Sequence, residues 1–133
     1  MNNVNYKIIE KISVEDFIEI LNKSTLRERL PVNDKNRIKN ILDNSNLLIG
    51  AYLNQNLVGI VRCVTDFYYC CYISDLAVYV EYQNKGIGKQ LIEEVKNKLM
   101  KDTKIVLLAA PNAINYYSNI GFEKSENSFL TKV

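Results

Sequence analysis

The stretch that decides the fold is Asp75-Leu76-Ala77-Val78-Tyr79-Val80-Glu81-Tyr82-Gln83-Asn84-Lys85-Gly86-Ile87-Gly88-Lys89-Gln90-Leu91-Ile92. It predicts, in this order, a buried strand, a short turn, a glycine-bracketed loop and the first turn of a helix. A helix start leaves backbone N–H groups unpaired, and the helix dipole favours negative charge there. Because Gly86 and Gly88 have no side chains, a pyrophosphate can approach the backbone of residues 83–88. The stretch therefore predicts an anion site.

The spacing Gln83-x-x-Gly86-x-Gly88 matches neither of the two common phosphate motifs. A Walker loop needs a Lys-Ser/Thr pair after its second glycine, and a dinucleotide-binding loop needs a third glycine. Two glycines before a helix are also common in a plain strand-to-helix turn. The loop alone therefore leaves both an anion site and a structural turn open, and other parts of the chain must decide.

Two blocks of the chain resemble the GNAT superfamily of N-acetyltransferases. Residues 77–88 resemble its acetyl-CoA-binding motif, Gln/Arg-x-x-Gly-x-Gly/Ala, and residues 112–122 resemble its Ala-x-x-Phe/Leu-Tyr-x-x-x-Gly-Phe helix. The blocks stand in the family's order, with one helix and one strand between them. The resemblance covers residues 47–131, and the N-terminal third is compatible with it. Ala110 departs from the family, in which many members carry a cofactor-contacting Asn at that position; Asn112 and Asn115 are the candidate substitutes.

The remaining pattern predicts a first strand over residues 5–12, a helix capped by Ser13, and a second helix from residue 33. Strands over residues 47–53 and 57–64 form a hairpin around residues 54–56, and a strand over residues 68–80 follows. Next come a helix over residues 86–100, an apolar strand over residues 105–110 that suits burial on both faces, a helix over residues 113–119, and a last strand or pair from Phe122.

The predicted fold class is α+β or α/β. The strand–helix–strand crossover makes the strand in the 70s and the strand at 105–110 parallel neighbours. The GNAT resemblance implies a mixed, mostly antiparallel sheet of six to seven strands flanked by about four helices. It also implies that the parallel pair splays apart to admit CoA. We expect residues 1–133 to form a single domain of this type.

Composition excludes several classes of function. The chain is 47% hydrophobic and 24% charged with a net charge of +2, which gives no electrostatic basis for binding nucleic acid or a membrane. No signal peptide or membrane-length apolar run is visible, so a cytoplasmic location is expected. Cys70 and Cys71 are adjacent in a predicted strand and point to opposite faces, which disfavours a disulfide framework or a metal knuckle.

The chain contains no histidine. A Ser-His-Asp triad, a Cys-His dyad and a His-ligated zinc site are therefore excluded, and no metal is expected. Any general base must be a carboxylate, a tyrosine, a lysine or water. This absence narrows the mechanism more than any residue that is present.

The GNAT resemblance implies acetyl-CoA as cosubstrate and assigns residues to it. Backbone groups of one strand would pair with the pantetheine arm, and the glycine loop would hold the phosphates. The residues implied are Leu76, Ala77 and Val78 for pantetheine, Gln83, Asn84, Lys85, Gly86, Ile87, Gly88 and Lys89 for the phosphates, and Asn112 and Tyr117 for further contacts.

Tyr117 is the predicted general acid. Attack of an amine on the thioester releases a CoA thiolate, and a phenol with a pKa near ~10 is able to protonate it. The resemblance places Tyr117 beside the sulfur and assigns Tyr116 to packing; without it, both would be core aromatics. Asp75 is the predicted base, because it lies near the place where the resemblance implies a carboxylate or an ordered water, and because a carboxylate within a strand is costly to bury unless it is hydrogen-bonded or functional. Asp66 and Glu81 are weaker candidates. The alternative is that Asp75 is a structural residue with a hydrogen-bond partner, and that water or backbone carbonyls take the role of the base.

The sequence thus predicts direct transfer of acetyl from acetyl-CoA to a primary amine of a small molecule. The candidate acceptor-binding residues are Arg27 and Arg29, in a basic segment, and Tyr72, in a tyrosine-rich strand. A solvated basic face is the plainer interpretation of the arginines, and sheet-face packing explains Tyr72 equally well. The alternatives are a non-catalytic acyl-CoA-binding sensor, a nucleotide-binding regulator, and a protein N-terminal or lysine acetyltransferase. A homodimer formed through helix faces suits the fold, although no interface is specified.

Overall fold

The computed structural model describes residues 3–24 and 30–133. Within these residues, five strands form one mixed sheet. The strands lie side by side in chain order: β1 (Val4–Ile8), β2 (Leu47–Leu53), β3 (Asn56–Thr65), β4 (Cys70–Val78) and β5 (Lys104–Leu107). The first four pair antiparallel, and β4 pairs parallel with β5. The helices are α1 (Val14–Ser24), α2 (Lys35–Asp43), α3 (Ile87–Lys96) and α4 (Ile114–Asn119), with short 3-10 turns at η2 (Val80–Tyr82) and η3 (Pro111–Ala113).

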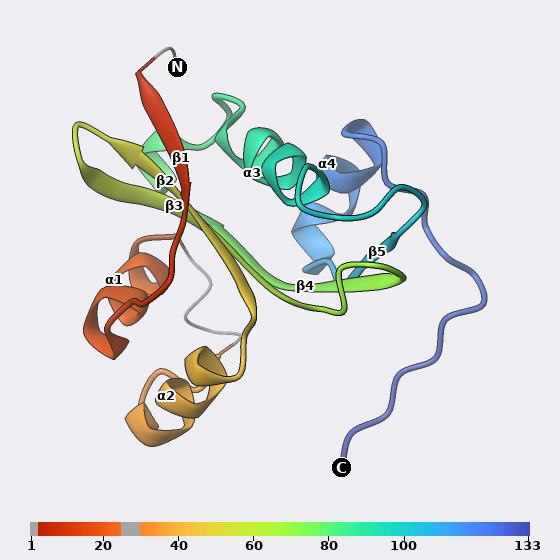
Figure 1. Ribbon diagram of the computed structural model, residues 1–133, viewed down its shortest axis with the longest axis horizontal. Helices are drawn as coiled ribbons and strands as arrows, with labels where there is room; N and C mark the ends of the chain where they lie inside the picture. Colours follow the sequence, from red (N-terminus) through yellow and green to blue (C-terminus); the bar gives the residue numbers. More distant parts are fainter. Residues whose placement is uncertain (1–2, 25–29) are drawn as a thin grey trace.

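Each face of the sheet carries its own apolar core. Helices α1 and α2 cover one face, where Phe17 and Ile38 pack with Leu48, and α3 covers the other, where Leu91 packs with Ile49 (Figure 1). Leu48 and Ile49 are consecutive in β2 yet belong to different cores, because successive residues of a strand point to opposite faces. The sheet is therefore the middle layer of three.

The local signals read from the sequence form the expected turns and caps. The side-chain Oγ of Ser13 accepts a hydrogen bond of 3.0 Å from the N–H of Asp16, as predicted for the cap of α1. Asn54 and Gln55 join β2 to β3 with φ angles of 51° and 70°. Two consecutive positive φ values define the tight hairpin turn whose twist matches that of its strands, so the predicted hairpin is confirmed.

The predicted parallel pair is confirmed and is short. Residues 70–73 of β4 pair with residues 104–107 of β5, and β4 then continues to Val78 paired with β3 only. In Figure 1 the chain after β5 moves away from the second half of β4 toward α4. The two strands therefore splay apart at their carboxyl ends, as the resemblance implies.

Two predictions about the C-terminal part are wrong. The sheet has five strands rather than six to seven, because the described residues after Phe122 add none. Residues 123–128 are all polar, so this segment has little apolar surface to bury, and Phe129 is 98% exposed. As a result β5 is an edge strand with one neighbour, and Val106 is exposed instead of buried on both faces. None of the described helices has the length and hydropathy needed to cross a membrane.

Candidate active site

A cleft of about 920 Å³ opens where β4 and β5 diverge. Its walls come mainly from the second half of β4, the loop that leads into α3, the end of β5 with the chain after it, and α4, and Ser24 at the end of α1 adds to them. The structure brings together most of the residues predicted from the sequence. Those lining the cleft are Asp75, Leu76, Val78, Gln83, Asn84, Gly86, Ile87, Gly88, Lys89, Asn112 and Tyr117.

The other predicted residues lie elsewhere. The side chain of Ala77 is buried in the core under α1 and α2, and Lys85 does not line the cleft. Tyr72 also lies outside the cleft, in a row across the sheet with Val64 and Val106. Arg27 and Arg29 fall outside the described residues.

The loop before α3 has the geometry of an anion cradle. Asn84 and Gly86 adopt left-handed backbone conformations, with φ angles of 63° and 87°. Left-handed residues within such a loop turn successive N–H groups toward one side. Gln90 makes the first backbone hydrogen bond of α3: its N–H donates to the carbonyl of Gly86, the N-cap residue, over 3.0 Å. Residues 87–89, which precede it, all line the cleft, where the helix dipole and Lys89 favour an anion.

Gln83 fixes this loop to the strand. Its side-chain Nε2 donates a hydrogen bond of 2.9 Å to the carbonyl oxygen of Val78 at the end of β4. The amide that the sequence suggested for phosphate contact therefore binds the strand end in this structure. Gln83 holds the cradle and the strand edge in one fixed relation.

The ending of α4 explains the spacing Tyr-x-x-x-Gly-Phe. Gly121 is left-handed with φ of 101°, and the N–H of Phe122 donates to the carbonyl of Tyr117 over 3.0 Å. The N–H of Gly121 donates to the carbonyl of Ser118, which completes a Schellman ending. Such endings bring the side chains of these same two positions together, and the rings of Tyr117 and Phe122 meet edge-on with centroids 5.6 Å apart. The motif thus holds Tyr117 at the cleft wall.

Tyr116 also lines the cleft, which the sequence did not predict. A Cβ added to Gly88 would lie 2.5 Å from the Tyr116 hydroxyl oxygen, so this phenol reaches the first turn of α3. Partial burial raises the pKa of Tyr116. No sequence signal shows which of Tyr116 and Tyr117 reaches α3, because this depends on how the short helix α4 is rotated against α3.

Asp75 lies in the cleft wall with a buried cation behind it. Arg62 on β3 and Asp75 on β4 are each only 6% exposed, and the guanidinium Nε donates to the Asp75 carboxylate. A carboxylate that accepts such a charge-assisted hydrogen bond has a structural partner within the sheet. The geometry thus favours the alternative of a partnered Asp75 over a general base.

The weaker base candidates do not line the cleft. Asp66 caps the turn between β3 and β4, where its Oδ1 accepts hydrogen bonds from the N–H groups of Tyr68, Tyr69 and Cys70. These backbone hydrogen bonds, above all that of Cys70, lower the pKa of Asp66. Glu81 is exposed in η2, and it too is absent from the cleft wall.

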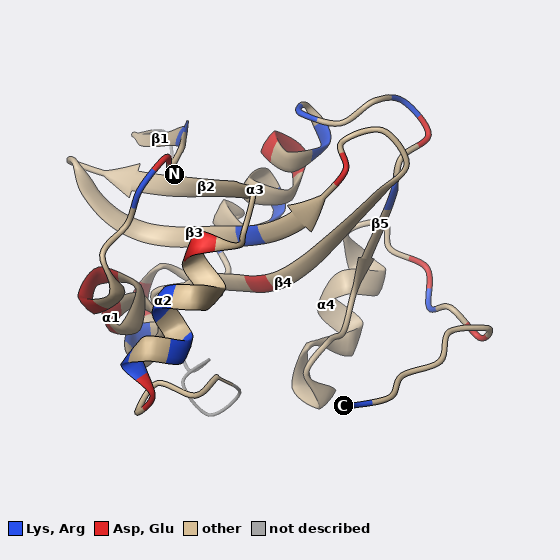
Figure 2. Ribbon diagram, turned by 60° about the horizontal axis from the view of Figure 1, so that its bottom comes forward, with Lys and Arg blue, Asp and Glu red and all other residues tan. Residues whose placement is uncertain are grey.

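The three cysteines are free thiols outside the cleft wall. Cys63 and Cys71 are buried on neighbouring strands, and their mutual hydrogen bond raises the pKa of Cys63 and lowers that of Cys71. In the part of the chain that the structure describes, no cluster of three or more His, Cys, Asp or Glu is placed to hold a metal ion. Figure 2 shows that α4 carries no charged residue, so charge in the cleft comes from β4 and the start of α3.

Comparison with known proteins gives the family. A family model described as an acetyltransferase (GNAT) domain matches residues 8–132. An uncharacterized ycf52-like N-acetyltransferase from Prochlorococcus marinus is 32% identical over 124 residues, which cover 86% of this chain and 67% of that protein. The chain spans about half the length of other ycf52 relatives that it matches.

Solved structures share the fold. A GNAT family acetyltransferase from Streptococcus pneumoniae superposes with a TM-score of 0.76 at 21% identity and covers 98% of this chain and 99% of its own. An aminoglycoside N-acetyltransferase in complex with CoA superposes with a TM-score of 0.73 at 16% identity, covering 98% of this chain and 94% of its own. At such identities the likeness is one of fold.

Proposed function

The chain belongs to the acetyltransferase (GNAT) family, and on that premise we propose that it transfers an acetyl group from acetyl-CoA to a primary amine of a small molecule. One observation carries the proposal: a single cleft joins an anion cradle, the second half of β4 beyond the ladder with β5, and a tyrosine. A diphosphate, an amide-rich arm and a thioester require these three features in that order.

The cleft residues fit the parts of acetyl-CoA. The amides of residues 87–89 and the charge of Lys89 suit the diphosphate. The backbone of residues 76–78 suits the pantetheine amides, which can pair with a strand as an added strand would. Asn112, in the chain after β5, adds a polar side chain to the same wall.

The reaction we propose is a direct transfer without a covalent enzyme intermediate. The amine nitrogen attacks the thioester carbonyl carbon, and a backbone N–H near Val78 stabilises the oxyanion of the tetrahedral intermediate. When the carbon–sulfur bond breaks, the Tyr117 hydroxyl donates its proton to the thiolate. Water takes the proton released by the amine, since the Asp75 carboxylate is bonded to Arg62, and Tyr117 is reprotonated from solvent.

Support for a small-molecule acceptor comes from the fold neighbour that acetylates aminoglycosides, because those acceptors are small polyamines. The test is release of CoA thiol with a panel of amines that contains an aminoglycoside, a polyamine, an amino acid and a lysine peptide. We expect turnover with at least one small amine. Turnover with the peptide alone would make this a protein acetyltransferase. Acetyl-CoA binding without turnover on any amine of the panel, the lysine peptide included, would favour an acyl-CoA sensor.

A further inference from the structure

Strand β4 contains an irregularity where the cleft begins. Arg62 on β3 stands opposite Asp75, and the next residue, Cys63, stands opposite Ile73. Ser74 is therefore the extra residue of a β-bulge. The parallel ladder with β5 ends at Ile73, immediately before it. Bulges bend a strand and re-aim its side chains, so this one sets the direction in which residues 76–78 run along the cleft.

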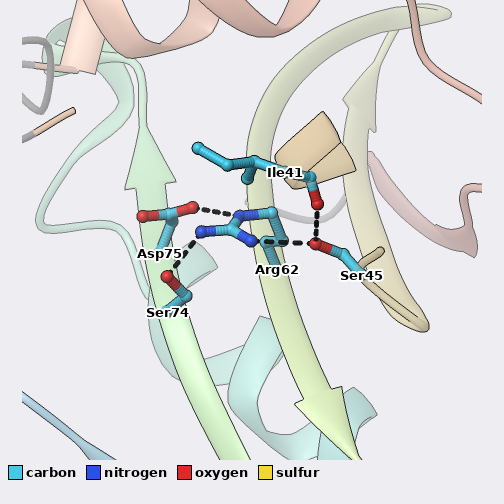
Figure 3. A network of polar contacts seen from close by, with 5 residues as sticks. All are labelled: Ile41, Ser45, Arg62, Ser74 and Asp75. Atoms are coloured by element: carbon cyan, nitrogen blue, oxygen red, sulfur yellow. Dashed lines mark hydrogen bonds and ion pairs between the residues drawn. The ribbon is translucent and has the colours of Figure 1, made fainter. Parts of the chain in front are cut away.

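One side chain binds both residues of the bulge. The Arg62 guanidinium donates through Nε to the Asp75 carboxylate, through Nη2 to the Ser74 hydroxyl, and through Nη1 to the Ser45 hydroxyl over 2.8 Å (Figure 3). Ser45 in turn donates to the carbonyl of Ile41 in α2 over 2.7 Å. Arg62 thereby joins the bulge to the end of α2.

The cleft lies on the far side of this contact. Ser74 and Asp75 line the cleft, whereas Arg62 does not, so the guanidinium supports the wall from behind. A buried ion pair adds little net stability compared with an apolar pair of similar size, because both charges lose their water. The planar Arg62 guanidinium instead donates in three fixed directions and so restricts the positions of Ser74 and Asp75. A strand edge that must align with a thioester needs such a restriction.

We propose that Arg62 is a positioning residue for acetyl transfer. It holds the bulge at Ser74 and Asp75 so that the backbone of residues 76–78 meets the pantetheine arm and the acetyl group in the productive alignment. This inference rests on the proposed acetyltransferase function. It assigns no contact between Arg62 and either substrate.

Arg62→Lys is the first test, because lysine keeps the charge but cannot reproduce a three-way planar fork. We expect kcat to fall by about 100-fold, the scale of a misplacement near 1 Å. The Kd for CoA should rise far less than kcat falls, since the proposed diphosphate contacts at the start of α3 do not involve Arg62. The control is Lys39→Met, which removes the exposed Lys39–Asp43 ion pair on α2 and should leave kcat unchanged. An unchanged kcat in Arg62→Lys would overturn the proposal.

A double variant separates positioning from stability. Arg62→Met alone leaves the Asp75 charge buried without its cation and should lower the Tm. Arg62→Met with Asp75→Asn removes both charges and should regain most of that Tm, yet kcat should stay low because the fork is still missing. If kcat returned together with the Tm, Arg62 would be a structural residue only.

Amide hydrogen exchange tests the inference without reference to turnover. In Arg62→Lys we expect faster exchange at residues 74–78 and unchanged exchange in α3. Unchanged exchange at residues 74–78 would contradict the inference even if acetyl transfer were observed. A wild-type protein that binds no acetyl-CoA would instead contradict the proposed function, so the two failures are distinguishable.

Discussion

Tyr117→Phe is expected to lower kcat by about 100- to 10,000-fold, the usual contribution of a positioned general acid. The substitution removes one oxygen and leaves the ring that packs edge-on against Phe122, so α4 and its Schellman ending should persist. The Kd for acetyl-CoA should stay near the wild-type value, because the diphosphate cradle lies at the start of α3. Thiol release gives kcat, and isothermal titration gives the Kd.

Tyr116→Phe is the matched control for Tyr117→Phe. It makes the same chemical change one residue earlier on α4, at a phenol that reaches Gly88 rather than the proposed position of the sulfur. Its kcat should remain close to that of the wild type. Equal losses in both variants, or no loss in Tyr117→Phe, would mean that water protonates the thiolate and that Tyr117 is a packing residue.

Gly88→Ala is expected to raise the Kd for acetyl-CoA by about tenfold or more, since overpacking typically costs about 1–3 kcal/mol. The family motif accepts alanine at this position, but here the new methyl group would lie 2.5 Å from the Tyr116 hydroxyl oxygen. Either the phenol moves within the cleft or the first turn of α3 shifts. Both changes disturb the cradle, and titration with acetyl-CoA measures the effect.

Tyr116→Phe should rescue Gly88→Ala. Without the hydroxyl, the nearest Tyr116 atom to the alanine methyl is the ring Cζ at 3.5 Å, which is an ordinary contact distance. A double-mutant cycle of the four Kd values should therefore show strong coupling between the two positions. Additive effects would show that the methyl group blocks the diphosphate directly and that Tyr116 has no part in excluding it.

The elements of this fold that local chemistry determines could be predicted from the sequence. Ser13 caps α1, the pair Asn54-Gln55 makes the hairpin turn, and the apolar patterns give the correct order of strands and helices as far as α4. The spacing of Tyr117, Gly121 and Phe122 also has a local cause, because one helix ending requires all three. These features depend on residues close together in the chain.

The features that were not predicted depend on distant residues. Arg62 binds Asp75 across 13 positions, and the register of that pairing depends on a bulge that leaves no periodic signal. The place of Tyr116 depends on the packing of α4 against α3. The strand predicted after Phe122 is absent for a different reason, because the polar run that follows Phe122 makes a sixth strand unfavourable. The apolar pattern of residues 105–110 does not reveal that β5 has a strand on one side only.

The loop at residues 83–88 and the splayed strands β4 and β5 together form the proposed acetyl-CoA site. Isothermal titration of the purified protein with acetyl-CoA, CoA and ATP tests it most directly. We predict binding of acetyl-CoA and CoA at roughly micromolar concentrations, the lower end of the usual range for enzyme substrates, and no binding of ATP. Failure to bind either form of CoA would contradict the account and leave the glycine loop as a structural turn.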